Sequence, residues 1–397
     1  MRDIVLHLGS GQVSVVAVTA VGYAWTSDPR LSDVDLRFLH SNQIRAVRRD
    51  TGKMSTVGSF VNSLTRMRWD ADALATDIIA SARALHFGNI LAVLDNPLMM
   101  LIAHRVAQAL GLPMTSLVWD SPDYLLSRHG FDRFSQRYLV GEFNKCLKAS
   151  QRVAVVSEAM QLEYGSRTRA PVHVLRHGVP MTFAGGHETG PSFDAPEWLI
   201  GFAGSMYSEC AWRAFLSALD AADWTIAGKP VRLKLITPSI VLASRKQARI
   251  DYLGCMPEAE DAQALLAECH LNYLPQPFSA GLRDLSQFSF PTKLTSYLVT
   301  GRPVFVHSPQ GASLSEFYAD NPIGVHSTTL QPGLILRDIE AFLSNRAAYK
   351  QACRQVRTTA LAHFDLPVFH CAIDRAIYGA ELEAEGGERD TPGARRN

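Results

Sequence analysis

Residues 288–304 set the fold class of this chain, and they read Phe-Ser-Phe-Pro-Thr-Lys-Leu-Thr-Ser-Tyr-Leu-Val-Thr-Gly-Arg-Pro-Val. Pro291 sits where a helix tolerates proline, in its first turn, because that position needs no amide hydrogen. Leu294, Tyr297 and Leu298 follow at helical spacing and give the helix one apolar face. Gly301 ends the helix and Pro303 prevents its continuation. The stretch therefore predicts a helix over 291–300 that leads into a strand.

The following residues, Val304-Phe-Val306, predict a short buried strand. A helix packed against a parallel strand presents free amides and a positive dipole end to an anion. Lys293 lies in the first turn, where a cation without a nearby anion is unfavourable by up to about 1 kcal/mol. A solvated first-turn lysine is the alternative. The energetics favour Lys293 as a phosphate ligand.

Composition excludes several classes of protein. A chain of 397 residues exceeds the usual size of one core, which predicts two domains. The formal net charge of +1 argues against a general nucleic-acid binder. Six scattered cysteines without a Cys-x-x-Cys pair predict reduced thiols instead of disulfides or a zinc ribbon. There is neither a bilayer-spanning apolar run nor a signal-peptide pattern, so we expect a cytoplasmic protein, free or resting on the inner face of a membrane.

The first half alternates strands with helices, which predicts a parallel sheet. Two strands at 4–8 and 13–20 are expected around a plain Gly9-Ser10-Gly11 turn. Further strands are expected at 90–94, 115–119, 152–156 and 172–175, and helices at 70–85, 98–110, 131–149 and 158–164. Asp120 follows a strand, where ligands of such sheets bind, so it is a candidate for chemistry. A helix-capping role for Asp120 is the open alternative.

Residues 45–69 are basic and end at an aromatic residue, Trp69. Such a segment can contact anionic lipid heads, each basic residue adding about 1 kcal/mol near the surface. A solvated face with a mobile loop around 51–53 explains the pattern equally well. Asp33-Val34-Asp35 has the spacing of a metal site, but its turn-like, Arg-containing surroundings indicate a solvated loop.

The second half begins after residues 181–197, whose Gly-, Pro-, Thr- and Ser-rich sequence predicts a linker. Strands are expected at 198–203, 233–236, 250–253 and 271–274, and helices at 211–219, 258–269 and 347–362. Gly204-Ser205-Met206 predicts a small-residue turn between a strand and a helix. Residues 275–287 are expected to form a long loop, and a last helix to run to about 378. The Gly-, Glu- and Arg-rich tail over 381–397 is predicted to be disordered.

The order of these motifs resembles that of GT-B nucleotide-sugar glycosyltransferases. The resemblance rests on the Gly-Ser turn at 204, the Pro-Thr-Lys-Leu…Gly-Arg-Pro-Val stretch at 291–304, and the segments 155–160 and 175–179. It covers roughly residues 90 to 369. More narrowly, the pattern is similar to the bacterial polysaccharide family of retaining mannosyl- and glucosyltransferases, glycosyltransferase family 4-like.

The resemblance implies an α/β GT-B fold, two tandem Rossmann-like doubly wound domains with a cleft between them. Residues 1–180 would form the acceptor domain, joined by the helix at about 365–380, and residues 198–362 the donor domain. The resemblance implies Asp120 as a catalytic residue, with His129 as a second candidate that can alternatively be interfacial. The donor would be bound by Gly204, Ser205, Arg213, Gly254, Cys255, Met256, Arg283, Lys293 and Ser296.

The sequence departs from the family pattern at three places. The family's Glu-x7-Glu pair corresponds to Phe288 and Ser296, its His-Asp pair to Trp119 and Asp120, and its cation after the Gly-Ser turn at best to Arg213.

The implied activity is transfer of a hexosyl group from a nucleotide sugar to a glycan or lipid-linked acceptor, in bacterial surface polysaccharide synthesis. No metal and no cofactor besides the donor are expected. A nucleotide-sugar epimerase and a non-catalytic partner protein with the same fold are the alternatives.

Overall fold

The computed structural model describes residues 2–9, 12–19, 29–41, 56–182, 191–238 and 240–379. The chain divides into two compact units. Unit 1 comprises Met1–Val155, Glu163–Leu175 and His370–Asn397, and unit 2 comprises Val156–Leu162 and Arg176–Phe369. Most of the predicted Gly-Ser-Gly turn, residues 45–55 of the basic segment, 183–190 of the linker and the predicted tail lie outside the described residues.

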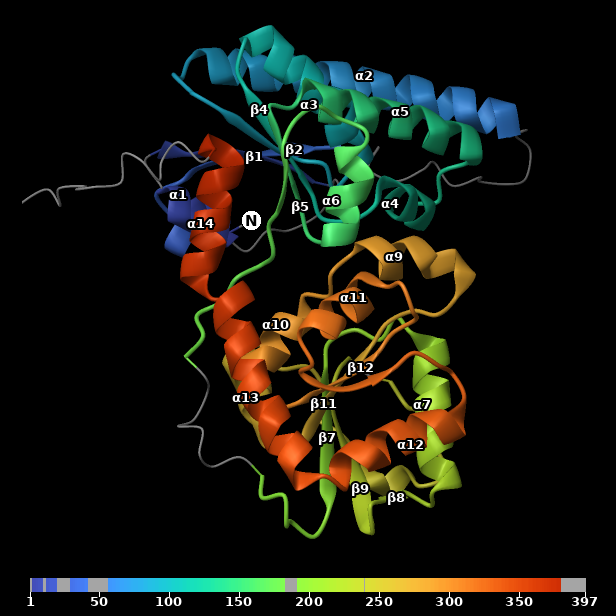
Figure 1. Cartoon of the computed structure of the whole chain (residues 1–397). Coiled ribbons are helices and arrows are strands. Elements are labelled where there is room, and N and C mark those ends of the chain that lie inside the picture. Colours follow the sequence, from blue (N-terminus) through green and yellow to red (C-terminus); the bar gives the residue numbers. More distant parts are fainter. Residues whose placement is uncertain are drawn as a thin grey trace, which may run out of the picture. The chain divides into compact units, whose positions relative to one another are not determined.

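Unit 1 holds a four-stranded parallel sheet in the order β3-β4-β5-β6 (Figure 1). Its strands are β3 (Ile90–Val93), β4 (Met114–Val118), β5 (Arg152–Val155) and β6 (Val172–Val174). The helices after each strand are α3 (Pro97–Leu110), α4 (Pro122–Arg128) with α5 (Arg133–Ala149), and α6 (Glu158–Gly165). A second, two-stranded parallel sheet pairs β1 (Ser14–Thr19) with β2 (Asp35–His40). The predicted parallel sheet is therefore confirmed.

Local chemistry explains why α3 has these bounds. The Asn96 side chain accepts a hydrogen bond from the Met99 amide at 3.0 Å, and Pro97 occupies the first turn. At the other end Gly111 adopts the left-handed conformation, with φ of 68°. Both signals are present in the sequence, and the predicted helix at 98–110 agrees with the observed one to within a residue at its start.

Two predictions for unit 1 were wrong. Residues 4–8 form part of a helix, α1 (Arg2–Leu8), whose residues Ile4 and Val5 are buried. A short apolar run does not by itself distinguish a strand from a helix. In the structure the His7 imidazole of this helix lies 2.9 Å from the Asp374 carboxylate, far along the chain. The helix expected at 70–85 is much longer in the structure. Helix α2 spans Thr56–Arg83 and includes the end of the basic segment.

Unit 2 holds a parallel sheet in the order β10-β9-β7-β11-β12-β13 (Figure 1). The strands are β7 (Trp198–Ala203), β9 (Lys229–Ile236), β10 (Ile250–Tyr252), β11 (Leu271–Pro275), β12 (Val304–His307) and β13 (Gly324–Ser327), and the short β8 (Thr225–Ile226) pairs antiparallel with β9. The chain adds β9 and β10 on one side of β7, and then β11, β12 and β13 on its other side. The sheet is therefore doubly wound, and its strand order reverses between β7 and β11. Ligands of such sheets bind at that switch point, beyond the carboxyl ends of the strands.

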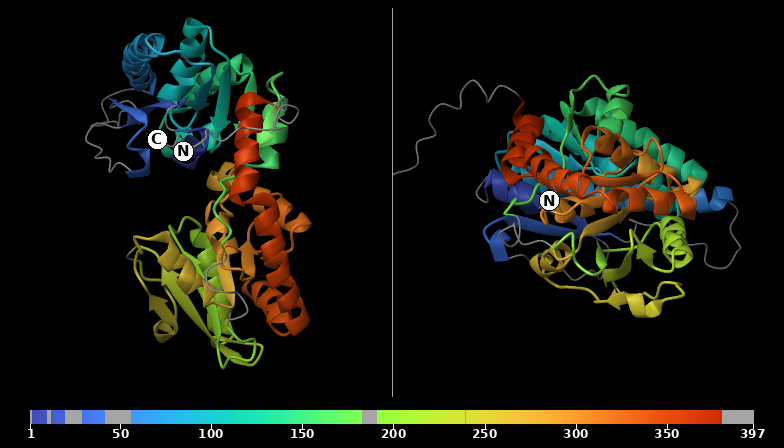
Figure 2. Two further views of the ribbon diagram at one scale, coloured as in Figure 1. Left: turned by 90° about the vertical axis from the view of Figure 1, so that its left-hand side faces the viewer. Right: turned by 60° about the horizontal axis from the view of Figure 1, so that its bottom comes forward.

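The two faces of this sheet carry separate apolar clusters, and successive residues of β12 point alternately into them. Phe305 joins the cluster that includes Phe215 of α7 (Glu209–Ala221) and Ile339 of α12 (Pro332–Leu343). Val304 and Val306 join the cluster that includes residues of α10 (Lys293–Leu298), α11 (Ser313–Asp320) and α13 (Arg346–His363), the long helix seen in Figure 2. The remaining helices are α8 (Ala259–Ala267), α9 (Arg283–Phe288) and α14 (Leu366–Tyr378).

Two details around the opening stretch differ from expectation. The predicted long loop at 275–287 contains a 3-10 turn at Ala280–Leu282 and helix α9. The helix expected over 291–300 has only six residues, beginning at Lys293 with Thr292 as its N-cap, so Pro291 lies before it. Within the described ranges no helix combines the length and apolarity needed to cross a bilayer.

Replacing Gly324 with alanine should disrupt the pairing of β13 with β12. The glycine has φ of 155°, and a methyl group there would lie 2.4 Å from the Val304 carbonyl oxygen, an atom of rigid strand backbone. We expect Gly324→Ala to lower the free energy of unfolding by roughly 2–4 kcal/mol. Gly333→Ala in α12, where a methyl group meets nothing within 4 Å, should be near neutral in the same urea titration. Equal stability of the two variants would contradict this account.

Candidate functional site

The turn at Gly204-Ser205 lies at the switch point of the unit 2 sheet. Gly204 directly follows β7 and has φ of 99°, a conformation that side chains with a Cβ rarely adopt. Its amide donates to the Ile236 carbonyl at 2.9 Å, which ties the turn to the end of β9. Gly204 and Ser205 are exposed, and within the described chain the Ser205 amide donates to no protein acceptor. The turn thus offers a polar backbone group to a ligand.

Helix α10 holds this turn from one side. The Ala203 amide donates to the Tyr297 hydroxyl oxygen at 3.0 Å, and that hydroxyl lies 3.3 Å from the Ala203 carbonyl oxygen. Tyr297 is fully buried, and burial raises the pKa of its hydroxyl. A buried phenol with two backbone partners fixes the distance between α10 and the end of β7. The sequence marked Tyr297 only as an apolar position of the helix.

Lys293, one helical turn before Tyr297, reaches the same turn. Its ammonium donates to the Ser205 carbonyl oxygen and lies 4.6 Å from the centroid of the Phe202 ring and 4.5 Å from that of Tyr207. Burial lowers the pKa of Lys293 to about 8. In the described residues no carboxylate pairs with this ammonium, so its charge is balanced only by a carbonyl and two aromatic faces.

The arrangement can bind an anion. An ammonium that has lost part of its hydration and has no carboxylate partner gains from an incoming negative charge. Glycine at 204 leaves room for the Lys293 stem beside the turn, because a methyl group there would lie 2.8 Å from Lys293 Cε. Since α10 has only six residues, the preference for an anion comes from the ammonium and the turn, with a small contribution at most from the helix dipole.

The other predicted donor-binding residues are less closely connected to this group. Ser296 lies on α10 and is half-buried. Arg213 is exposed on α7 and pairs with Glu209 at 2.5 Å, and Arg283 is the exposed first residue of α9. Neither arginine is among the described polar and aromatic contacts of Lys293, which are with Ser205, Phe202 and Tyr207.

The predicted segment 254–256 follows β10. Gly254 has φ of 74°, which explains a glycine at this position, and Cys255 is an exposed free thiol. Met256 is half-buried and packs against the apolar cluster that contains Leu294 and Tyr297. The structure therefore brings Gly204, Ser205 and Lys293 together and leaves the segment 254–256 as a separate element of the same unit.

In unit 1 the two catalytic candidates share an electrostatic environment with a third residue, Asp95. Asp120 follows β4 and His129 ends α4, whose N-cap position is Ser121. Asp95 follows the neighbouring strand β3. Surrounding protein raises the pKa of the Asp95 carboxyl, a hydrogen bond from the Asn96 amide at 3.0 Å opposes that rise, and Asp120 raises the pKa while His129 lowers it. Asp95 is not among the candidate site residues predicted from the sequence.

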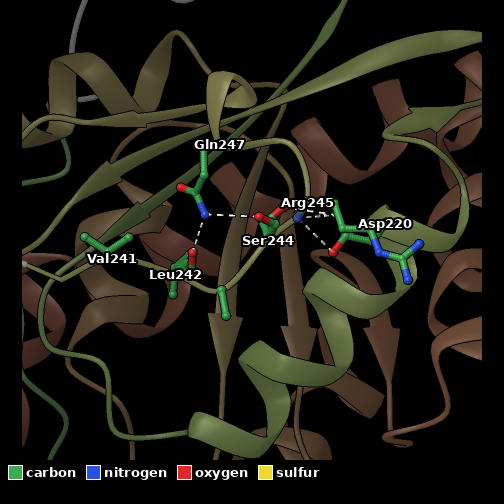
Figure 3. Close-up of a pocket in the computed structure, with 7 residues that line it drawn as sticks. Asp220, Val241, Leu242, Ser244, Arg245 and Gln247 are labelled. Carbon is green, nitrogen blue, oxygen red and sulfur yellow. Dashed lines mark hydrogen bonds between the residues drawn. The ribbon is translucent and has the colours of Figure 1, made fainter.

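A shallow surface pocket lies elsewhere in unit 2, lined by Asp220 and residues of the 241–247 loop (Figure 3). Its polar groups bind one another: Asp220 accepts from the Ser244 hydroxyl at 3.1 Å and from the Arg245 amide at 3.3 Å, and the Gln247 amide donates to the Leu242 carbonyl at 2.6 Å. Asp220 belongs to the last turn of α7, whereas the Gly204 turn precedes that helix. The polar groups that line the pocket therefore form hydrogen bonds with one another, and none of the predicted site residues lines it.

Adding a methyl group at Gly204 should displace Lys293. We expect Gly204→Ala to lower the free energy of unfolding by about 1–2 kcal/mol, because alanine at this φ is strained. Acetic anhydride should also modify Lys293 faster, as measured by mass spectrometry.

Gly228→Ala is the matched control, because Gly228 has φ of 74° with open space around its Cβ position. This variant should show the stability loss without the change at Lys293. Unchanged labelling of Lys293 in Gly204→Ala would contradict the proposed contact.

No protein-family model and no curated protein sequence matches this chain. Solved structures do match. The chain is similar to sucrose-phosphate synthase from Thermosynechococcus elongatus, with 11% identity, a TM-score of 0.64, and coverage of 97% of this chain and 92% of that one. It is similar to α,α-trehalose-phosphate synthase (UDP-forming) from Burkholderia vietnamiensis, with 13% identity, a TM-score of 0.61, and coverage of 97% and 98%. HepE from Anabaena, in complex with UDP and glucose, matches with 13% identity, a TM-score of 0.58, and coverage of 94% and 93%. These similarities show that the chain has the α/β fold of GT-B glycosyltransferase structures, with a parallel sheet in each unit.

Proposed function

We propose that this protein is a glycosyltransferase that moves a hexosyl group from a nucleotide sugar to a glycan or lipid-linked acceptor. The observation that carries the proposal is the Lys293 ammonium, which lies beside the Gly204-Ser205 turn without a carboxylate partner in the described chain. The fold adds support, because one similar structure holds UDP and glucose and another is described as UDP-forming. We further propose that the pathway is bacterial surface polysaccharide synthesis, as the sequence resemblance implies.

In this proposal unit 2 binds the donor. Departure of a nucleoside diphosphate builds negative charge on its phosphates while the sugar becomes oxocarbenium-like. Lys293 stabilises that charge, and the Ser205 amide donates to a phosphate oxygen. Arg283, Arg213 and Ser296 remain proposed donor ligands, as do residues 254–256, which are proposed to contact the nucleotide base. No metal is required for this role, because the cation that stabilises the leaving group is a side chain.

Unit 1 is proposed to bind the acceptor. Asp120 is the proposed base or charge-stabilising carboxylate, and His129 is its proposed partner on the acceptor side. Asp95 adds a second carboxyl to the electrostatic environment of Asp120.

The two alternative functions, epimerase and non-catalytic partner, predict different experimental results. An epimerase would convert a nucleotide sugar without any acceptor. A non-catalytic partner that keeps only the fold would bind no nucleotide sugar at millimolar concentration. A thermal-shift screen with UDP, GDP, ADP, CMP and their sugars, followed by product analysis with and without acceptor, distinguishes all three.

Removing the Lys293 amine should abolish nucleotide binding. Lys293→Met keeps the apolar stem against Phe202 and Tyr207 but removes the charge. The thermal shift given by the nucleoside diphosphate that stabilises the wild-type protein should disappear. Lys350→Met removes an exposed lysine from α13 of the same unit and should keep the full shift. A full shift in Lys293→Met would refute the proposed role of this residue.

Nucleotide affinity should also depend on pH through Lys293. The free protein holds this lysine protonated below its pKa of about 8, and only the protonated form attracts a phosphate. Affinity measured by calorimetry should therefore be nearly constant below about pH 7, be about halved at about pH 8, and fall about tenfold per pH unit well above that. The opposite sign, tighter binding at alkaline pH, is incompatible with an ammonium ligand. Lys293→Met should lack the dependence.

Asp120→Asn should separate chemistry from donor binding. The amide has nearly the shape of the carboxylate but neither accepts a proton nor carries charge. We expect transfer to fall about 100-fold or more, with the thermal shift by the nucleotide unchanged. Asp123→Asn, at an exposed position in the first turn of α4, serves as the nearby control. Wild-type transfer in Asp120→Asn would remove this residue from the mechanism.

A further inference from the structure

Helix α2 exposes an apolar row that nothing in the proposed function uses. Val57, Val61 and Trp69 fall on one i, i+4 row with Thr65 between them. Their exposed fractions are 62%, 53% and 76%, whereas the opposite side of the helix buries Met67, Ala71 and Leu74. Helix α2 is thus apolar on its core side and also on part of its outer side. Exposed apolar side chains of this kind mark a surface that binds a protein or a membrane.

Helix α5 extends this surface. Phe134, which is 58% exposed, lies 6.1 Å from Phe60 of α2 between ring centroids. Two turns further along α2, the Arg68 guanidinium lies 5.7 Å from the Tyr138 ring centroid. These two contacts place the first halves of α2 and α5 side by side within unit 1 (Figure 1). The result is one continuous feature, which we call the α2–α5 surface: residues 56–69 together with residues 133–141.

The charge of the α2–α5 surface has one sign. The two segments contain four arginines, Arg66, Arg68, Arg133 and Arg137, and no aspartate or glutamate. All four arginines are exposed. The flanking carboxylates are occupied within unit 1: Asp70 accepts from the Ser41 hydroxyl at 2.7 Å, and Asp132 caps α5 by accepting from the Phe134 and Ser135 amides. The whole chain carries a net charge of only +1, so this local excess is a feature of the surface.

We propose that the α2–α5 surface docks on an anionic lipid bilayer. Arginines attract anionic headgroups, while valine, phenylalanine and tryptophan side chains enter the boundary between headgroups and acyl chains. An RNA backbone matches the arginines but gives exposed valines nothing to bind. The mixture of aliphatic, aromatic and cationic side chains on adjacent helices therefore favours lipid. The proposal concerns binding alone and does not depend on transferase activity.

The test is co-sedimentation of the full chain with vesicles. Phosphatidylcholine vesicles containing about 30 mol% phosphatidylglycerol should bind the protein, and pure phosphatidylcholine should bind it much more weakly. Each arginine should raise the affinity for anionic vesicles about fivefold. The double variant Arg133→Gln/Arg137→Gln should therefore bind these vesicles with about 25-fold lower affinity. Val61→Ser/Phe134→Ser should remove the binding that persists when salt is raised to about 0.5 M.

The control is Lys350→Gln/Arg354→Gln, which removes the same charge from two exposed positions on α13 of unit 2. It should bind vesicles like the wild-type protein, and circular dichroism melts should show that all variants fold. Equal binding to neutral and anionic vesicles, or equal weakening by the control, would overturn the proposal. So would arginine variants that keep vesicle binding but lose binding to polyuridylate, which would assign the surface to nucleic acid.

Discussion

Two contacts of one helix face govern the candidate site. Tyr297 and Lys293 are four residues apart on α10, so they project from the same side, and both reach the end of β7. The tyrosine hydroxyl holds the backbone of Ala203 and the lysine ammonium holds the carbonyl of Ser205. Glycine at 204 allows this approach, because a methyl group there would lie 2.8 Å from Lys293 Cε.

The ammonium is placed at an energetic disadvantage. Burial opposes the charged form of Lys293, and no carboxylate in the described chain compensates for it. A protein that needed only stability would place an apolar residue between Phe202 and Tyr207 or give the lysine an acidic partner. An anionic ligand would relieve the imbalance and recover the local loss of stability as binding energy. This is the physical reason for the proposal that Lys293 binds phosphate.

Predictions from sequence succeeded where local signals agree. The Asn96-Pro97 cap, the Gly111 stop and the alternating burial along β12 are properties of neighbouring residues. Such local signals predicted most strands and helices of the two larger sheets, but not β8 or β13. Predictions failed where the local pattern is short or ambiguous. Residues 4–8 belong to a helix whose His7 contacts Asp374, far along the chain, and residues 283–288 form α9 where the sequence predicts the end of a long loop.

The amino-acid sequence by itself determined the alternation of strand and helix, the glycine required at 204 and the presence of a lysine at the start of α10, because these depend on periodicity and backbone conformation. Only the tertiary structure decided that Lys293 meets Phe202, Tyr207 and Ser205. It also decided that Asp95 shares its surroundings with Asp120, and that α2 and α5 form one surface. Such pairings depend on strand order and helix packing, and no local pattern of residues encodes which distant side chains will share the same low-dielectric space.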